Sequence, residues 1–67
     1  MKKRSVRIAG HATSISLEEE FWDALKEIAE RDKTSVPLLI SQIDETRGAQ
    51  NLSSAIRVFV LKRAAHT

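Results

Sequence analysis

The N-terminal third of the chain alternates apolar and polar residues, and the parity of the alternation changes once. Val6 and Ile8 lie on one parity. From residue 13 onward the inward positions fall on the other parity, at Thr13, Ile15 and Leu17. A two-residue repeat is typical of a half-buried strand, and its parity can switch only through a bulge or a turn. Gly10 lies between the two halves, so the sequence predicts either a hairpin centred on Gly10 and His11 or one long strand with a bulge there.

Both alternatives predict a single solvent-facing row. It contains Lys3, Ser5, Arg7, Ala12, Ser14 and Ser16. Residues 1–4 are expected to form a basic arm, followed by a strand region over residues 5–17. A lone strand is not stable by itself, so it must pair within its own chain or with another chain. In a chain this small we expect pairing between two chains, which would give a two-stranded antiparallel ribbon with two-fold symmetry.

After residue 17 the repeat lengthens to the spacing of a helix face. Its apolar positions are Phe21, Trp22, Leu25, Ile28 and Ala29. Ser16 is followed three residues later by Glu19, which fits a capping box, and acidic residues crowd the first turn. These features predict a helix over residues 18–32.

Two further helices are predicted, over residues 35–47 and 52–65. The second helix would be capped by Thr34 or Ser35, carry Pro37 in its first turn and end near Gly48. The third would be capped by Asn51 or Ser53. Its apolar residues exceed one core face, because Val58 and Leu61 lie outside the stripe that Leu52, Ile56, Phe59 and Val60 form. This favours a surface for a partner chain, the alternative being a central helix covered on two sides.

The small size of the chain limits its stability and its chemistry. Its 67 residues form one domain and contain no cysteine, which excludes disulfides and thiolate zinc sites and favours oligomerisation as the missing stabiliser. His11 and His66 are at opposite ends without ligand spacing, so we expect no metal and no cofactor. No phosphate loop, dinucleotide fingerprint or nucleophile elbow occurs, and the chain has little room for a substrate pocket. We therefore expect that the protein is not an enzyme, and no small-molecule ligand is evident from the sequence.

The charges are strongly segregated along the sequence. Residues 1–11 carry a net charge of +4, residues 12–32 carry −5, and residues 49–67 carry +3. Basic ends flanking an acidic helix indicate a polyanionic partner. No apolar run is long enough to cross a bilayer, and no signal-peptide pattern is present, so we expect no membrane association and a cytoplasmic location.

The order of short motifs resembles the ribbon-helix-helix DNA-binding family, which includes Arc-type and methionine repressors, and in particular its short bacterial members. The motifs are Lys3-Arg4-Ser5-Val6, Gly10-His11, Thr13-Ser14, Ser16-Leu17-Glu18, Phe21-Trp22, Ile43-Asp44 and Asn51-Leu52-Ser53-Ser54-Ala55, which extend over nearly the whole chain. The resemblance implies a mostly α fold with an N-terminal β-strand, a ribbon-helix-helix with an additional C-terminal helix, and an intertwined homodimer. It leaves open whether the helix at residue 35 or the helix at residue 52 corresponds to the second helix of the family; normal turn length favours the former.

The resemblance also implies a function and a set of contacts. The expected function is that of a transcriptional regulator whose dimeric ribbon enters the major groove of DNA with palindromic or tandem half-sites. The expected DNA-binding residues are Lys3, Arg4, Arg7, His11, Ser14, Ser16, Ser35 and Val36. Ala12 departs from the pattern, which carries a basic residue after the histidine. The alternative is a small homodimeric protein–protein interaction module that does not bind DNA, which Ala12 and the short outward serines favour.

Overall fold

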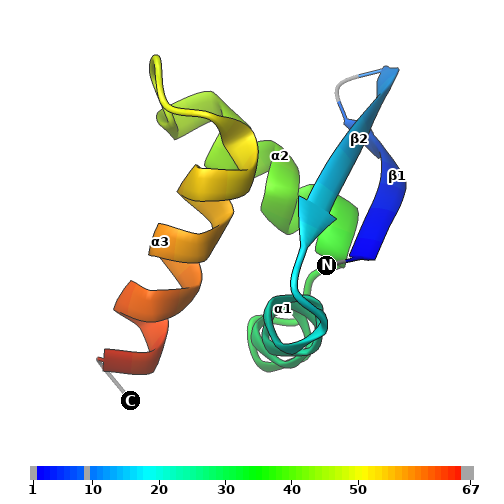
Figure 1. Cartoon of the computed structure of the whole chain (residues 1–67). Coiled ribbons are helices and arrows are strands. Elements are labelled where there is room, and N and C mark those ends of the chain that lie inside the picture. Colours follow the sequence, from blue (N-terminus) through cyan, green and yellow to red (C-terminus); the bar gives the residue numbers. More distant parts are fainter. Residues whose placement is uncertain (1, 9, 66–67) are drawn as a thin grey trace.

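A β-hairpin packs on three helices in the computed structural model, which describes residues 2–8 and 10–65 (Figure 1). The elements are β1 (Lys2–Ile8), β2 (His11–Leu17), α1 (Glu19–Arg31), α2 (Val36–Thr46) and α3 (Leu52–Ala65). Met1 of the expected arm and His66 lie outside the described residues. Lys2 to Arg4, expected as part of that arm, instead form the first half of β1.

The two strands form an antiparallel ribbon within one chain. The pairing runs from Lys2 opposite Leu17 to Ile8 opposite His11. Gly10 has a φ of +85°, a conformation that L side chains rarely adopt, which explains a glycine at the connection. Of the two alternatives, the hairpin is therefore correct, and the bulged strand is not formed. His11, expected at the centre of the hairpin, is instead the first residue of β2 and pairs with Ile8. The expectation that the strand pairs with a strand of another chain is wrong, because β2 pairs with β1 of the same chain.

The core lies between the inner face of the hairpin and the helices. α2 contacts β1, α1 and α3, and α3 also contacts β2. The fully buried side chains are those of Ile15, Leu17, Leu25, Ile40 and Ile56. The predicted core face of α1 is confirmed, with Trp22, Leu25, Ile28 and Ala29 buried and Phe21 partly buried against them.

The ends of the helices follow from local chemistry, with one exception. Ser35 caps α2 by accepting a hydrogen bond from the Leu38 amide at 3.3 Å. Asn51 precedes α3 and accepts from the Ser53 and Ser54 amides at 2.9 and 3.3 Å. At α1 the predicted capping box is wrong: Glu18 is the N-cap residue without a side-chain cap bond, because Ser16 is held in β2.

The outer side of α3 leaves two large apolar side chains in solvent. Val58 is 38% exposed and Leu61 is 62% exposed, while Ile56 on the opposite side of the helix is fully buried. The prediction that Val58 and Leu61 lie outside the core face is confirmed. Within the described residues, no helix is both long and apolar enough to cross a membrane.

Candidate nucleic-acid interface

The outer face of the hairpin carries the predicted row of polar and basic side chains. Directly opposed residues of an antiparallel ribbon share a face. The pairs on this face are Lys3 with Ser16, Ser5 with Ser14, and Arg7 with Ala12. All are exposed except Ser16, which is half-buried. The structure thus brings together four of the predicted contact residues: Lys3, Arg7, Ser14 and Ser16.

Two other predicted contacts, Arg4 and His11, lie on the opposite side of the ribbon. Arg4 pairs with Ile15, and its guanidinium carbon lies 5.3 Å from the centre of the Trp22 ring. His11 pairs with Ile8 at the connection end and is exposed. A strand alternates its side chains between two faces, so neither residue shares the row of Lys3 and Arg7. The alternation in the sequence had already left Arg4 and His11 out of the solvent-facing row, and they were expected as contacts because they are basic or polar residues near the ribbon.

The predicted anchor at the start of α2 lies beside β1. Val36 and Pro37 line a small pocket together with Arg4, Ser5 and Val6. Pro37 has no amide hydrogen, and the Leu38 amide is bound by the Ser35 hydroxyl. Among the amides of this first turn, that of Val36 has no described hydrogen-bond partner, whereas those of Leu38 and Leu39 do.

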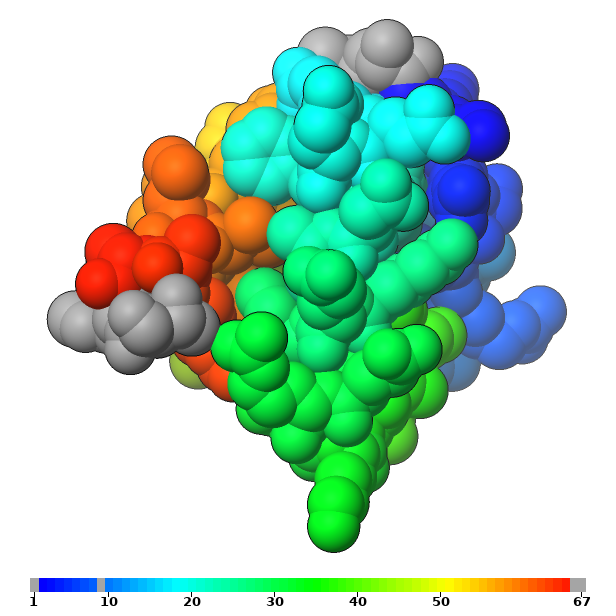
Figure 2. Space-filling view, turned by 90° about the horizontal axis from the view of Figure 1, so that it is seen from below, coloured from blue at the N-terminus to red at the C-terminus, as the bar shows by residue number. Residues whose placement is uncertain are grey.

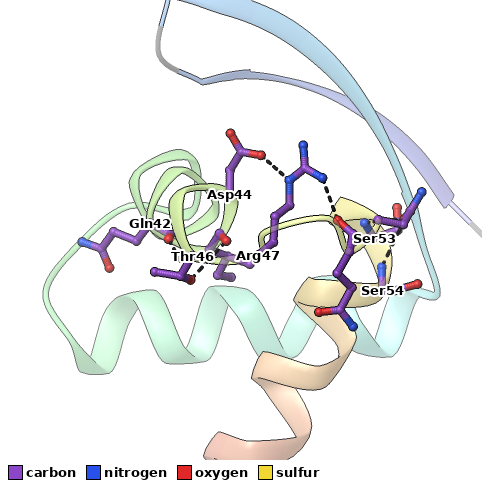
Figure 3. A network of polar contacts seen from close by, with 9 residues as sticks. Gln42, Asp44, Thr46, Arg47, Ser53 and Ser54 are labelled. Carbon is purple, nitrogen blue, oxygen red and sulfur yellow. Dashed lines mark hydrogen bonds and ion pairs between the residues drawn. The ribbon is translucent and has the colours of Figure 1, made fainter.

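The start of α3 lies beside β2, whereas the start of α2 lies beside β1. The sequence did not predict this position of α3. A pocket of about 370 Å³ separates residues 11–14 of β2 from the turn between α2 and α3. Figure 3 shows Arg47 in this turn, where its side chain reaches between Asp44 and the following loop. Arg47 donates to Asp44 Oδ1 at 2.5 Å and to the Gln50 carbonyl at 2.6 Å.

Arg47 was absent from the predicted contacts because its segment is neutral in the sequence and shows no basic cluster. The sequence contained one signal for this region, the hydroxyl-rich helix start at Asn51, which resembles the start of the second helix of the family.

The basic residues of α3 are largely used inside the fold. Arg57 Nε donates to Glu18 Oε1 at 3.0 Å, and Arg63 binds Asp32. The pKa of Glu18 is lowered, first by hydrogen bonding from its own backbone and then by Arg57. The pKa of Asp32 is lowered mainly by the hydrogen bond from Arg63. Two of the three basic residues of α3 are thereby paired with carboxylates at the ends of α1, whereas Lys62 stays exposed. On β1, Lys3 and Arg7 are exposed basic side chains on one face of the hairpin.

The comparisons with known proteins agree with this architecture. The model of the family described as Ribbon-helix-helix domain matches residues 1–64. A solved structure, that of an uncharacterized protein from Bordetella pertussis Tohama I, is 42% identical with a TM-score of 0.82. The match covers 96% of this chain and 55% of that chain, so the present chain spans about half the length of this relative. The search of curated proteins gives no match.

Proposed function

Because the chain belongs to the ribbon-helix-helix domain family, whose members are generally DNA-binding transcription regulators, we propose that it is a sequence-dependent DNA-binding protein. It would act as a transcriptional regulator and insert the outer face of its hairpin into the major groove. The observation that carries this proposal is the exposed row in which Lys3 and Arg7 flank small hydroxyl side chains. A two-stranded ribbon fits the width of the major groove, and the cations supply contacts to phosphates or base edges.

The proposed roles differ between the two kinds of residue in this row. Lys3 and Arg7 have long side chains with exposed charge, and they would provide most of the affinity. Ser14 and Ser16 are short, so they would contact bases only where the ribbon lies deep in the groove. The start of α2 at Ser35 and Val36 would anchor one phosphate. Sequence preference is then expected to be modest compared with the affinity for any duplex.

The proposal includes a second copy of the chain, because we expect the protein to bind DNA as a homodimer. The family typically binds DNA as dimers, and a homodimer would present one hairpin from each protomer to palindromic or tandem half-sites. Each hairpin is complete within its own chain, so dimerisation would set the spacing of the half-sites rather than build the ribbon.

Fluorescence anisotropy on a labelled random duplex, measured over a range of salt concentrations, tests the proposal. The logarithm of the affinity should fall by about 0.9 per log unit of salt for every phosphate neutralised. Lys3→Ala and Arg7→Ala should each weaken binding and flatten this slope, whereas Lys62→Ala, an exposed cation on α3, should leave both unchanged. Absence of binding by micromolar protein at about 50 mM salt would contradict the proposal.

The second candidate is a homodimeric interaction module that does not bind DNA. The exposure of Val58 and Leu61 favours it, because a chain of this size has few reasons to leave two large apolar side chains on one side of a helix. A dimer in sedimentation without a salt-dependent anisotropy change would select this alternative.

A further inference from the structure

We propose that Trp22 is a positioning residue: it holds the first half of β1 on α1 and thereby fixes the direction of Lys3. The part of this inference that concerns DNA rests on the function proposed above, whereas the part that concerns the strand does not. We also infer that Arg4 acts with Trp22 on the inner face and is not a DNA contact.

Trp22 holds β1 at two alternate residues. Its indole Nε1 donates a hydrogen bond of 3.0 Å to the Lys2 carbonyl, and its ring lies under the Arg4 guanidinium at 5.3 Å. Trp22 is 3% exposed, so the core packs around it and fixes its position. Because successive side chains of a strand point to opposite faces, holding the residues before and after Lys3 directs Lys3 outward.

The rest of β1 shows why this contact matters. Its apolar residues, Val6 and Ile8, are both in the second half of the strand. In the first half, Lys2, Lys3 and Ser5 are exposed and Arg4 is half-buried, so little apolar surface attaches this half to the helices. The ion pair of Lys2 with Glu19, at 3.9 Å between two exposed side chains, contributes little. This half of β1 is also paired with β2 along its length, so Trp22 is its principal described contact with the helices rather than its only support.

Trp22 and its aromatic neighbour Phe21 contact different elements of the fold. Figure 2 shows α1 between β1 on one side and α3 on the other. Trp22 is directed toward β1, whereas Phe21 lies beneath Arg57 of α3, with 6.0 Å from the guanidinium carbon to the ring centre. Two adjacent aromatic residues of one helix thus contact different elements. Arg57 also donates to the Ser16 carbonyl of β2 at 3.4 Å, so the Phe21 contact is itself connected to the hairpin.

Amide hydrogen exchange measured by NMR tests the positioning role without DNA. Trp22→Phe retains a ring for Arg4 and removes the donor to Lys2. Loss of one side-chain hydrogen bond should accelerate exchange of the protected hairpin amides about fivefold and leave those of α2 unchanged. As a control, Phe59→Leu changes a half-buried ring of α3 that lies against Arg63, and it should leave the hairpin amides at the wild-type rate. A purely structural role of Trp22 in the core would instead change the exchange of all elements together, and that result, or unchanged hairpin exchange, would overturn the inference.

The role of Arg4 is tested by comparing Arg4→Ala with Arg7→Ala. Arg4→Ala should accelerate hairpin exchange and weaken DNA binding without changing the salt slope, whereas Arg7→Ala should flatten the slope by about 0.9. Equal flattening by both variants would make Arg4 a phosphate contact and overturn its assignment. If the wild-type protein does not bind DNA, the proposed function fails, while the exchange experiment still decides whether Trp22 holds β1.

Discussion

Arg63 of α3 binds Asp32, the C-cap residue of α1, through two hydrogen bonds of 2.9 and 2.8 Å. The paired geometry matches the planar guanidinium to both carboxylate oxygens. At the other end of α1, Arg57 binds Glu18. α3 is therefore joined to both ends of α1 by ion pairs, in addition to its apolar contact with the core.

The Asp32–Arg63 pair predicts that stability falls at acidic pH. Arg63 lowers the pKa of Asp32 below its ordinary value of 3.8, and Asp32 raises the pKa of Arg63. A carboxyl whose folded-state pKa is depressed contributes stability above its unfolded pKa and loses it as the pH falls through the folded pKa. Urea unfolding at neutral pH should show Asp32→Asn to be less stable than wild type. The difference should shrink as the pH falls below 3.8 and through the folded-state pKa of Asp32, and a difference that does not shrink on acidification would contradict the prediction.

The sequence predicted the local features of the fold. The parity switch located the hairpin connection at Gly10, and the hydroxyl and amide side chains at Ser35 and Asn51 located two helix starts. These features depend on residues within a few positions of one another, and the sequence pattern contains them directly.

The contacts between distant segments could not be predicted in this way. The hydrogen bond of Trp22 to Lys2 spans twenty residues, and the bond of Arg57 to Glu18 spans thirty-nine. Periodicity assigned Trp22 to the core, but it could not show that the guanidinium of Arg4 lies over this ring. Likewise, the basic charge of α3 suggested a polyanion, and only the packing of α3 on α1 shows that Arg57 and Arg63 have partners within the chain.

The positive φ of Gly10 predicts a graded response to substitution. A Cβ at this position would meet nothing within 4 Å, so any loss of stability comes from the backbone conformation and not from a clash. Gly10→Val should lower the free energy of unfolding by about 1–2 kcal/mol, and Gly10→Asn should lower it less, because asparagine tolerates the left-handed region. Thermal unfolding by circular dichroism would measure both. Equal losses for the two variants would show that the conformation of Gly10 is not the cause.

The difference in burial between two leucines predicts a large difference in their stability effects. Leu25 of α1 is fully buried, whereas Leu38 of α2 is 59% exposed. Leu25→Ala should reduce the free energy of unfolding by about 2–5 kcal/mol through lost burial and a residual cavity. Leu38→Ala should change it by less than about 0.5 kcal/mol. Urea titrations of both variants provide the measurement, and a large loss for Leu38→Ala in dilute protein would indicate that this side chain is covered by another chain.

Replacing Ala12 with arginine should raise the affinity for DNA, because Ala12 is an uncharged residue on the outer face of the hairpin. It pairs with Arg7 across the ribbon and is exposed, so an arginine at this site would lie in the row proposed to enter the major groove. Ala12→Arg should tighten binding to random duplex and steepen the salt slope by about 0.9, the contribution of one further phosphate contact. Ala65→Arg, an exposed position at the end of α3, adds the same charge away from the hairpin and should change the slope far less. Salt titrations of the two variants side by side therefore separate a local contact from the general effect of one more positive charge, and equal slopes would argue that DNA does not approach the outer face of the hairpin.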